Sequence, residues 1–235
     1  MSRLFGGAMK DWRFVLNFCV FSFLFWAAEF AFQYFGPSEG QIGPSLYRSF
    51  GLAGATFFGL SLLSSSLFRF RPALARYWTV RRAFGVVGFL FIALHVLFVT
   101  NFLFEGNPFM AYYSLNPFEN PLIFGAAAFY ILLLVTLTST DWAVQKLGGK
   151  WKAVQRLVYF AFMLSIFHFI STNPAGLLNL AGYFLLLVTA LALLGELYWF
   201  IQVARQRNFK SLGTFIGLFI ILLYIAIAYL AFFSK

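Results

Sequence analysis

Charge is scarce in this sequence. Asp, Glu, Lys and Arg together make up 10% of its 235 residues, whereas hydrophobic residues make up 62%. A soluble globular domain carries about 25% charged residues, so the composition excludes a soluble protein and predicts a polytopic membrane protein. Cysteine is scarcer still, and the single Cys19 excludes an internal disulfide.

Seven apolar runs are long enough to cross a bilayer, which takes about 20 residues per helix. They lie at residues 13–35, 45–67, 82–104, 120–140, 151–172, 176–202 and 212–233. Segments rich in Gly, Pro, Asn or Arg separate the runs and predict turns. The first run is long enough to remain in the membrane, so no cleavable signal is expected. The sequence therefore predicts an all-α membrane helical bundle that forms one transmembrane domain over residues 1–235.

The basic residues fall on one side of this arrangement. Fifteen of the 17 lie before the first run or in the loops after the second, fourth and sixth, and only Arg48 and Lys235 lie opposite. Basic loops stay in the cytoplasm. We therefore expect a multi-pass protein of the cell membrane with a cytoplasmic N-terminus and an external C-terminus. The net charge of +10 then reflects orientation in the lipid bilayer and gives no reason to expect nucleic acid as a partner.

Histidine is also scarce, and both copies lie inside apolar runs. His95 is 13 residues past Arg82, and His168 is 17 residues past Trp151. At about 1.5 Å per residue, both side chains lie in the outer half of parallel helices. Ionisable residues in lipid are costly and mark functional sites. Two imidazoles at similar depth on different helices predict the two axial ligands of one haem iron.

Small residues accompany both histidines. Gly88 and Ala161 each precede a histidine by seven residues, which is two helical turns and places them on the same face. We expect this face to admit the edge of a haem, although small residues also serve helix packing. Other interpretations of the histidines stay open. A lone histidine can be simply a hydrogen-bonding residue, and Met163 offers a thioether ligand. A metal site of His and carboxylate is less favoured. No Cys-x-x-Cys-His motif is present, so any haem is held without thioether bonds.

Three stretches carry a resemblance to a known family. Residues 81–95, RRAFGVVGFLFIALH, resemble the third span of the ferric-reductase-like transmembrane superfamily. Residues 137–140 (LTST) and 150–159 (KWKAVQRLVY), followed by His168-Phe169, are similar to the MsrQ (YedZ) family. The resemblance covers residues 47–207, which hold five of the seven runs. The family core has six spans, so the run at 212–233 is left as an additional seventh span.

The resemblance implies a b-type haem electron-transfer protein, related to the membrane domains of NADPH oxidases and the STEAP metalloreductases. It implies that His95 and His168 are the outer haem ligands. Two-haem relatives carry a second histidine 13 or 14 residues inward on each span, where this chain has Arg81 or Arg82 and Val154 or Gln155. Arginine is always charged and is not a ligand. The lack of histidine at these inner positions predicts a single haem b.

The supply of electrons stays open at this point. No Gly-x-Gly-x-x-Gly motif opens a helix, so we expect electrons from a quinone in the membrane, a reductase or an outer redox partner protein. The basic segment 69–82 could dock a flavin phosphate, but orientation and lipid contact explain it better. Alternatives are a quinone-linked oxidoreductase that acts without a partner and a non-enzymatic scaffold that has lost its cofactor. Glu196 either pairs with an arginine of the inner loops, which we favour, or faces a cavity and relays a proton to or from a quinone.

Overall fold

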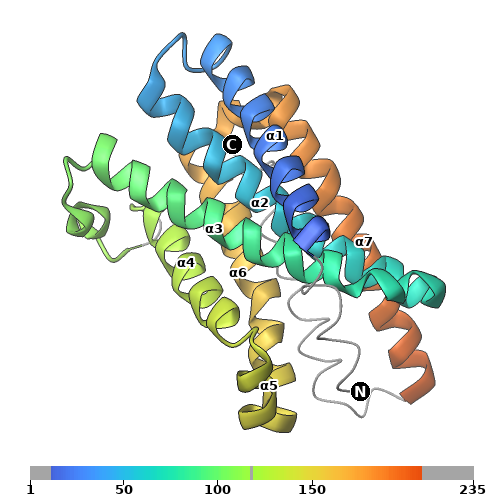
Figure 1. Cartoon of the computed structure of the whole chain (residues 1–235). Helices are drawn as coiled ribbons and strands as arrows, with labels where there is room; N and C mark the ends of the chain where they lie inside the picture. Colours follow the sequence, from blue (N-terminus) through green and yellow to red (C-terminus); the bar gives the residue numbers. More distant parts are fainter. Residues whose placement is uncertain (1–11, 117–118, 208–235) are drawn as a thin grey trace.

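A computed structural model describes residues 12–116 and 119–207 of the chain, and these residues form helices and connecting loops without strands. Figure 1 shows the helices as one bundle. The α-helices are α1 (Trp12–Phe35), α2 (Ile42–Phe70), α3 (Trp78–Phe102), α4 (Leu122–Leu137), α5 (Asp141–Leu147), α6 (Trp151–Thr172) and α7 (Leu180–Arg207). The 3-10 helices η2 (Pro72–Tyr77), η3 (Pro108–Tyr112), η4 (Gly148–Lys150) and η5 (Pro174–Leu178) lie between them.

Five helical segments are long and apolar enough to cross a membrane. They are Trp12–Phe35, Ile42–Phe70, Pro72–Phe102, Asp141–Thr172 and Leu180–Val203, and α4 is a shorter apolar helix of 16 residues. The predicted polytopic, all-α membrane bundle is therefore confirmed. The predicted seventh span at 212–233 lies outside the described residues.

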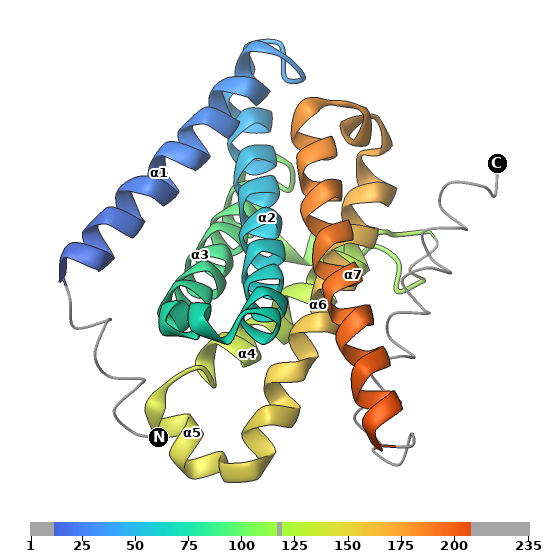
Figure 2. The same ribbon diagram turned by 90° about the vertical axis from the view of Figure 1, so that its right-hand side faces the viewer.

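Helix α2 is the centre of the bundle. It packs against α1, α3 and α7, and 67% of its most apolar window is buried, against 11% for α1. Its glycines permit close approach, since a Cβ on Gly54 would lie only 3.0 Å from the carbonyl oxygen of Gly88 on α3. Small residues at such contacts are the usual way in which membrane helices pack. Helix α1 lies at the edge of the bundle and leans away from most of it (Figure 2).

Several predicted spans have different ends in the structure, and proline and asparagine explain two of the differences. The span predicted at 45–67 begins at Ile42, because Pro44 falls in the first helical turn, where no backbone N–H needs an intrahelical partner. The span predicted to begin at 176 begins instead at Leu180. The side chain of Asn179 accepts a hydrogen bond from the backbone N–H of Gly182, at 2.9 Å, and so starts the helix there.

The bundle has two chemically distinct ends. We call the end that contains the start of α2 and the last turns of α3 and α6 the histidine end. We call the end that contains residues 69–82, between α2 and α3, the arginine end. The loop at the histidine end is held by the buried Asn120, whose side-chain amide donates to the carbonyl oxygens of Ala111 and Ser114 at 2.8 and 2.9 Å.

Candidate functional site

The structure brings the two histidines together at the histidine end. His95 lies on α3 and His168 on α6, and their ring centres are 6.4 Å apart with an angle of 69° between the ring planes. The prediction that these residues from different helices share one site therefore agrees with the geometry. Both side chains are half-buried.

Each imidazole is oriented by a backbone carbonyl of a neighbouring helix. Nδ1 of His95 lies 2.7 Å from the carbonyl oxygen of Tyr47, and Nδ1 of His168 lies 3.2 Å from that of Pro121. A carbonyl oxygen can only accept, so Nδ1 carries the proton and donates in both rings. Nε2 of each ring is then the basic nitrogen, as in histidines that bind metals, whose other ring nitrogen donates to a carbonyl or carboxylate.

Each ring also lies against a glycine four residues after that carbonyl. A Cβ on Gly51 would lie 2.9 Å from Nδ1 of His95, and a Cβ on Gly125 would lie 3.0 Å from three atoms of the His168 ring. The same arrangement therefore occurs twice, on α2 for one histidine and on α4 for the other. We call each pair of carbonyl and glycine (Tyr47 with Gly51, Pro121 with Gly125) a histidine seat.

The geometry of the two rings fits one iron ion between them. A bond from a metal to an imidazole nitrogen is about 2.0–2.1 Å long. Two imidazoles on opposite sides of one metal then have ring centres roughly 6–6.5 Å apart, and the observed separation is 6.4 Å. The protonated Nδ1 atoms, which face the carbonyls, leave both Nε2 atoms for the metal. The residues present therefore suit a haem with two histidine ligands.

The two small residues predicted beside the histidines serve helix packing in the structure. A Cβ on Gly88 would lie 3.2 Å from the carbonyl oxygen of Gly54 on α2, and Ala161 is fully buried in the hydrophobic core. Their contact with a haem stays a prediction. The seat residues were not predicted, since Gly51 is one of several glycines in an apolar run that also contains Gly54 and Gly59.

The positions that match an inner ligand pair in two-haem relatives are engaged in other contacts. The amide nitrogen of Gln155 donates to the carbonyl oxygen of Val135 at 3.0 Å and to Oγ1 of Thr138 at 3.1 Å. Arg82 donates to the carbonyl oxygen of Ser139, and the guanidinium of Arg81 lies over the ring of Trp78. The hydrogen bonds of Gln155 and Arg82 hold α6 and α3 to the end of α4, whereas Arg81 and Trp78 lie on the same helix.

The predicted partner of Glu196 is confirmed as Arg69. The carboxylate is buried, accepts from Nη1 of Arg69 at 2.7 Å and from Oγ of Ser66 at 3.1 Å, and joins α7 to α2. Among the residues that the structure describes, no three His, Cys, Asp or Glu side chains gather as a separate metal site. The histidine pair is thus the candidate centre.

A hydrogen bond between two tyrosines fixes η3, which lies outside the spans, to α4. The hydroxyl of Tyr112 donates to that of Tyr130 at 3.2 Å. This hydrogen bond, together with burial, raises the pKa of Tyr112 to about 12. Tyr112 therefore stays neutral, and keeps its donor, at any physiological pH.

Comparison with known proteins gives a family and named relatives. A family model described as "Ferric reductase like transmembrane component" matches residues 49–166, which include His95 and both seat glycines and end two residues before His168. Over 139 residues, the chain is 29% identical to the protein-methionine-sulfoxide reductase heme-binding subunit MsrQ of Brucella ovis. The aligned part makes up 57% of this chain and 61% of that protein. The chain is 26% identical over 112 residues to the protein of the same name from Agrobacterium fabrum, 47% of this chain and 51% of that protein. The chain thus spans about half the length of the curated relatives that it matches.

Proposed function

Because this chain belongs to the family of ferric reductase like transmembrane components, we propose that it is a membrane electron-transfer protein that holds one b-type haem between His95 and His168. The observation that carries the proposal is the pair of imidazoles with ring centres 6.4 Å apart, each with Nδ1 against a backbone carbonyl. The similar MsrQ proteins are named as heme-binding subunits, which supports the same cofactor here.

The residues of this chain would prepare the site before the haem binds. The seat carbonyls fix the ring orientation and keep Nε2 unprotonated, so each imidazole can act as a neutral ligand. The seat glycines let both rings lie directly against α2 and α4. Haem iron supplies a carrier that gains and loses one electron, and its potential depends on axial ligands and burial. Two neutral nitrogens in an apolar bundle would set that potential.

We propose a single haem because the other end of the same helices offers arginine and glutamine where inner ligands would stand. Gln155 is already bonded to the end of α4, and Arg81 and Arg82 keep their charge at any working pH. Electrons would then reach the haem from, or leave it for, a separate redox protein. The word "subunit" in the names of the MsrQ relatives supports such a partner.

The decisive experiment is the reduced-minus-oxidised spectrum of purified protein with the variants His95→Ala and His168→Ala. Each substitution removes an axial ligand, and the apolar surroundings offer little replacement, so we expect loss of the b-type bands in both variants. Ser165→Ala is the matched control on α6, because its hydroxyl only bonds the Ala161 carbonyl of its own helix. Its spectrum should remain unchanged.

The proposed number of haems per chain is tested separately. A pyridine haemochrome assay should give one haem per chain, and two haems would overturn the assignment at the arginine end. No haem in protein from haem-replete cells would overturn the proposal and favour a scaffold without cofactor. Reduction of the haem by a quinol analogue with no partner present would show that a redox protein is not required.

A further inference from the structure

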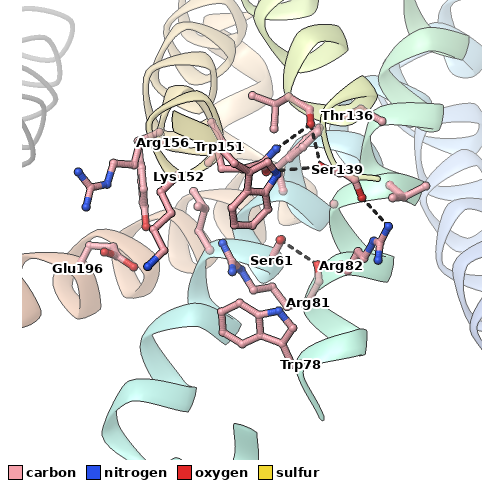
Figure 3. A pocket seen from close by; sticks show the side chains of 18 of the residues that line it. Ser61, Trp78, Arg81, Arg82, Thr136, Ser139, Trp151, Lys152, Arg156 and Glu196 are labelled. Carbon is pink, nitrogen blue, oxygen red and sulfur yellow. Dashed lines mark hydrogen bonds between the residues drawn. The ribbon is translucent and has the colours of Figure 1, made fainter. Parts of the chain in front are cut away.

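A cavity of about 400 Å³ lies at the arginine end, between α2, α3, α4, α6 and α7. Figure 3 shows side chains from several helices around it, with Arg81, Arg82 and Lys152 among those labelled. Its volume is within the range of small-molecule pockets, about 300–1,000 Å³. The cavity is distinct from the histidine site, since Arg81 precedes His95 by 14 residues on the same helix, roughly 20 Å.

Positive charge dominates the lining of this cavity. Five basic side chains and two carboxylates line it, which leaves a net charge of +3. Each carboxylate forms an ion pair, Glu196 with Arg69 at 2.7 Å and Asp141 with Arg82 at 3.4 Å. The positive excess therefore rests on Arg81, which is half-buried, and on Lys152 and Arg156, which are exposed at the mouth. Such an excess favours an anionic ligand.

Tryptophan rings lie against two of the arginines that line the cavity, Arg81 and Arg69. The guanidinium of Arg81 lies over the ring of Trp78, 4.6 Å from the centroid, and that of Arg69 lies 5.3 Å from the centroid of Trp199. Trp151, also in the lining, donates from Nε1 to the carbonyl oxygen of Thr138 at 2.9 Å. Fixed donors lose less conformational entropy when a ligand binds. Tryptophan at helix ends is typical of the membrane interface.

Apolar side chains also line the cavity, among them Phe58, Leu62, Val86, Val135 and Leu193, together with polar ones such as Ser61, Thr136 and Gln155. The cavity therefore offers both cations and apolar surface to a ligand. A ligand that matches both has an anionic head and an apolar body. The phosphate of a membrane lipid supplies the first and its acyl chains supply the second.

We infer that this cavity binds the head group of an anionic phospholipid, with the phosphate held by Arg81 and Lys152. The cavity opens among helices that span the membrane, at the end where the basic loops lie, and basic pockets between such helices bind anionic head groups. This inference does not depend on the proposed haem, because its residues belong to the opposite end of α3 and α6. The arginine and lysine residues at this end then bind a lipid head group in addition to setting the orientation of the chain in the membrane.

Native mass spectrometry of the full chain, released from nanodiscs that contain equal amounts of phosphatidylglycerol and phosphatidylcholine, tests the inference. We expect retained phosphatidylglycerol on the wild type and about fivefold less on Arg81→Gln and on Lys152→Gln, since one basic residue near the head group changes lipid binding by about that factor. Arg76→Gln is the matched control, because Arg76 has the same charge at the same end but is exposed and does not line the cavity.

Three results would overturn the inference. The first is equal retention of the two lipids by the wild type. The second is a loss of phosphatidylglycerol in Arg76→Gln as large as in Arg81→Gln. The third is binding of flavin mononucleotide in the cavity in place of the lipid. This soluble molecule carries a phosphate monoester and a flat ring. Circular dichroism checks that each variant is folded, and the thermal midpoint gives a second readout, which phosphatidylglycerol should raise in the wild type and not in Arg81→Gln.

Discussion

At the scale of single residues, the seats explain how an apolar bundle can hold two imidazoles in a defined orientation. In a helix, the carbonyl of residue i normally accepts the N–H of residue i+4. The carbonyl of Tyr47 on α2 accepts from His95, and that of Pro121, the residue before α4, accepts from His168 and from the N–H of Phe124. The residue at i+4 is glycine in both cases. Glycine has no side chain to block the ring, so the imidazole can reach the carbonyl from the side.

The variant Gly51→Ala should therefore weaken the site without touching a ligand. Its Cβ would lie 2.9 Å from Nδ1 of His95, so the ring must move and lengthen its bond to the Tyr47 carbonyl. Overpacking of this kind costs about 1–3 kcal/mol, which corresponds to a loss of about fivefold to 150-fold in haem affinity. Haem titration of the apoprotein, followed by absorbance, measures the change.

Gly85→Ala is the control for this prediction. It introduces the same methyl group on α3, but the nearest atom would be Oγ of Ser61 at 3.6 Å, an ordinary contact. Haem affinity should remain within twofold of the wild type. An undiminished affinity in Gly51→Ala would show that the seat does not control the ring.

The two histidines could be predicted from the sequence, and their seats could not. Ionisable residues inside apolar runs stand out because lipid makes them costly. Glycine does not stand out, since it is frequent in membrane helices, and only the fold places Gly51 and Gly125 against the rings. The cavity at the arginine end was missed for a related reason, because its lining comes from helices far apart in the chain and depends on side-chain direction.

At the scale of helices, a salt bridge with a buried carboxylate joins α2 to α7. Arg69 and Glu196 are 127 residues apart in sequence, and the carboxylate is only 3% exposed. Close packing accompanies the pair, since a Cβ on Gly195 would lie 2.7 Å from Cβ of Ser66. The sequence favoured an arginine partner for Glu196 over a proton relay, because this end of the span lies close to water, but several arginines were available.

We expect Glu196→Gln to destabilise the bundle clearly. The substitution leaves Arg69 without its counter-charge, and removing one partner of a buried pair costs about 3–5 kcal/mol. Because the side chain of Arg69 is 30% exposed, the loss should be near the lower end of that range. Thermal unfolding in detergent, followed by circular dichroism, should show a lower midpoint.

The matched control is Asp141→Asn, which removes the carboxylate of the exposed pair with Arg82. That carboxylate is 60% exposed and lies 3.4 Å from Nη1 of Arg82, and exposed pairs contribute less than about 1 kcal/mol. Its midpoint should stay close to that of the wild type. Equal effects in the two variants would mean that burial does not determine the strength of these pairs.

At the scale of the whole molecule, the distribution of charge links the two ends of the bundle to the two sides of the membrane. Basic residues gather at the arginine end, where Lys146, Lys150 and Lys152 also lie in or beside the loops. The histidine end carries Glu39, Glu105 and Glu119 instead. From the positive-inside rule, we propose that the arginine end is cytoplasmic and that the histidine site lies toward the outside.

Two cysteine variants, each made in a Cys19→Ser background, should report this orientation without a change of charge. Met110 lies in η3 at the histidine end and Gln145 lies in α5 at the other end, and both are exposed. In right-side-out membrane vesicles, a membrane-impermeant maleimide should label Met110→Cys directly, and Gln145→Cys only after detergent opens the vesicles. This pattern is expected because basic loops resist translocation. The opposite pattern would place the histidine site on the cytoplasmic side, where the haem would exchange electrons with a cytoplasmic partner.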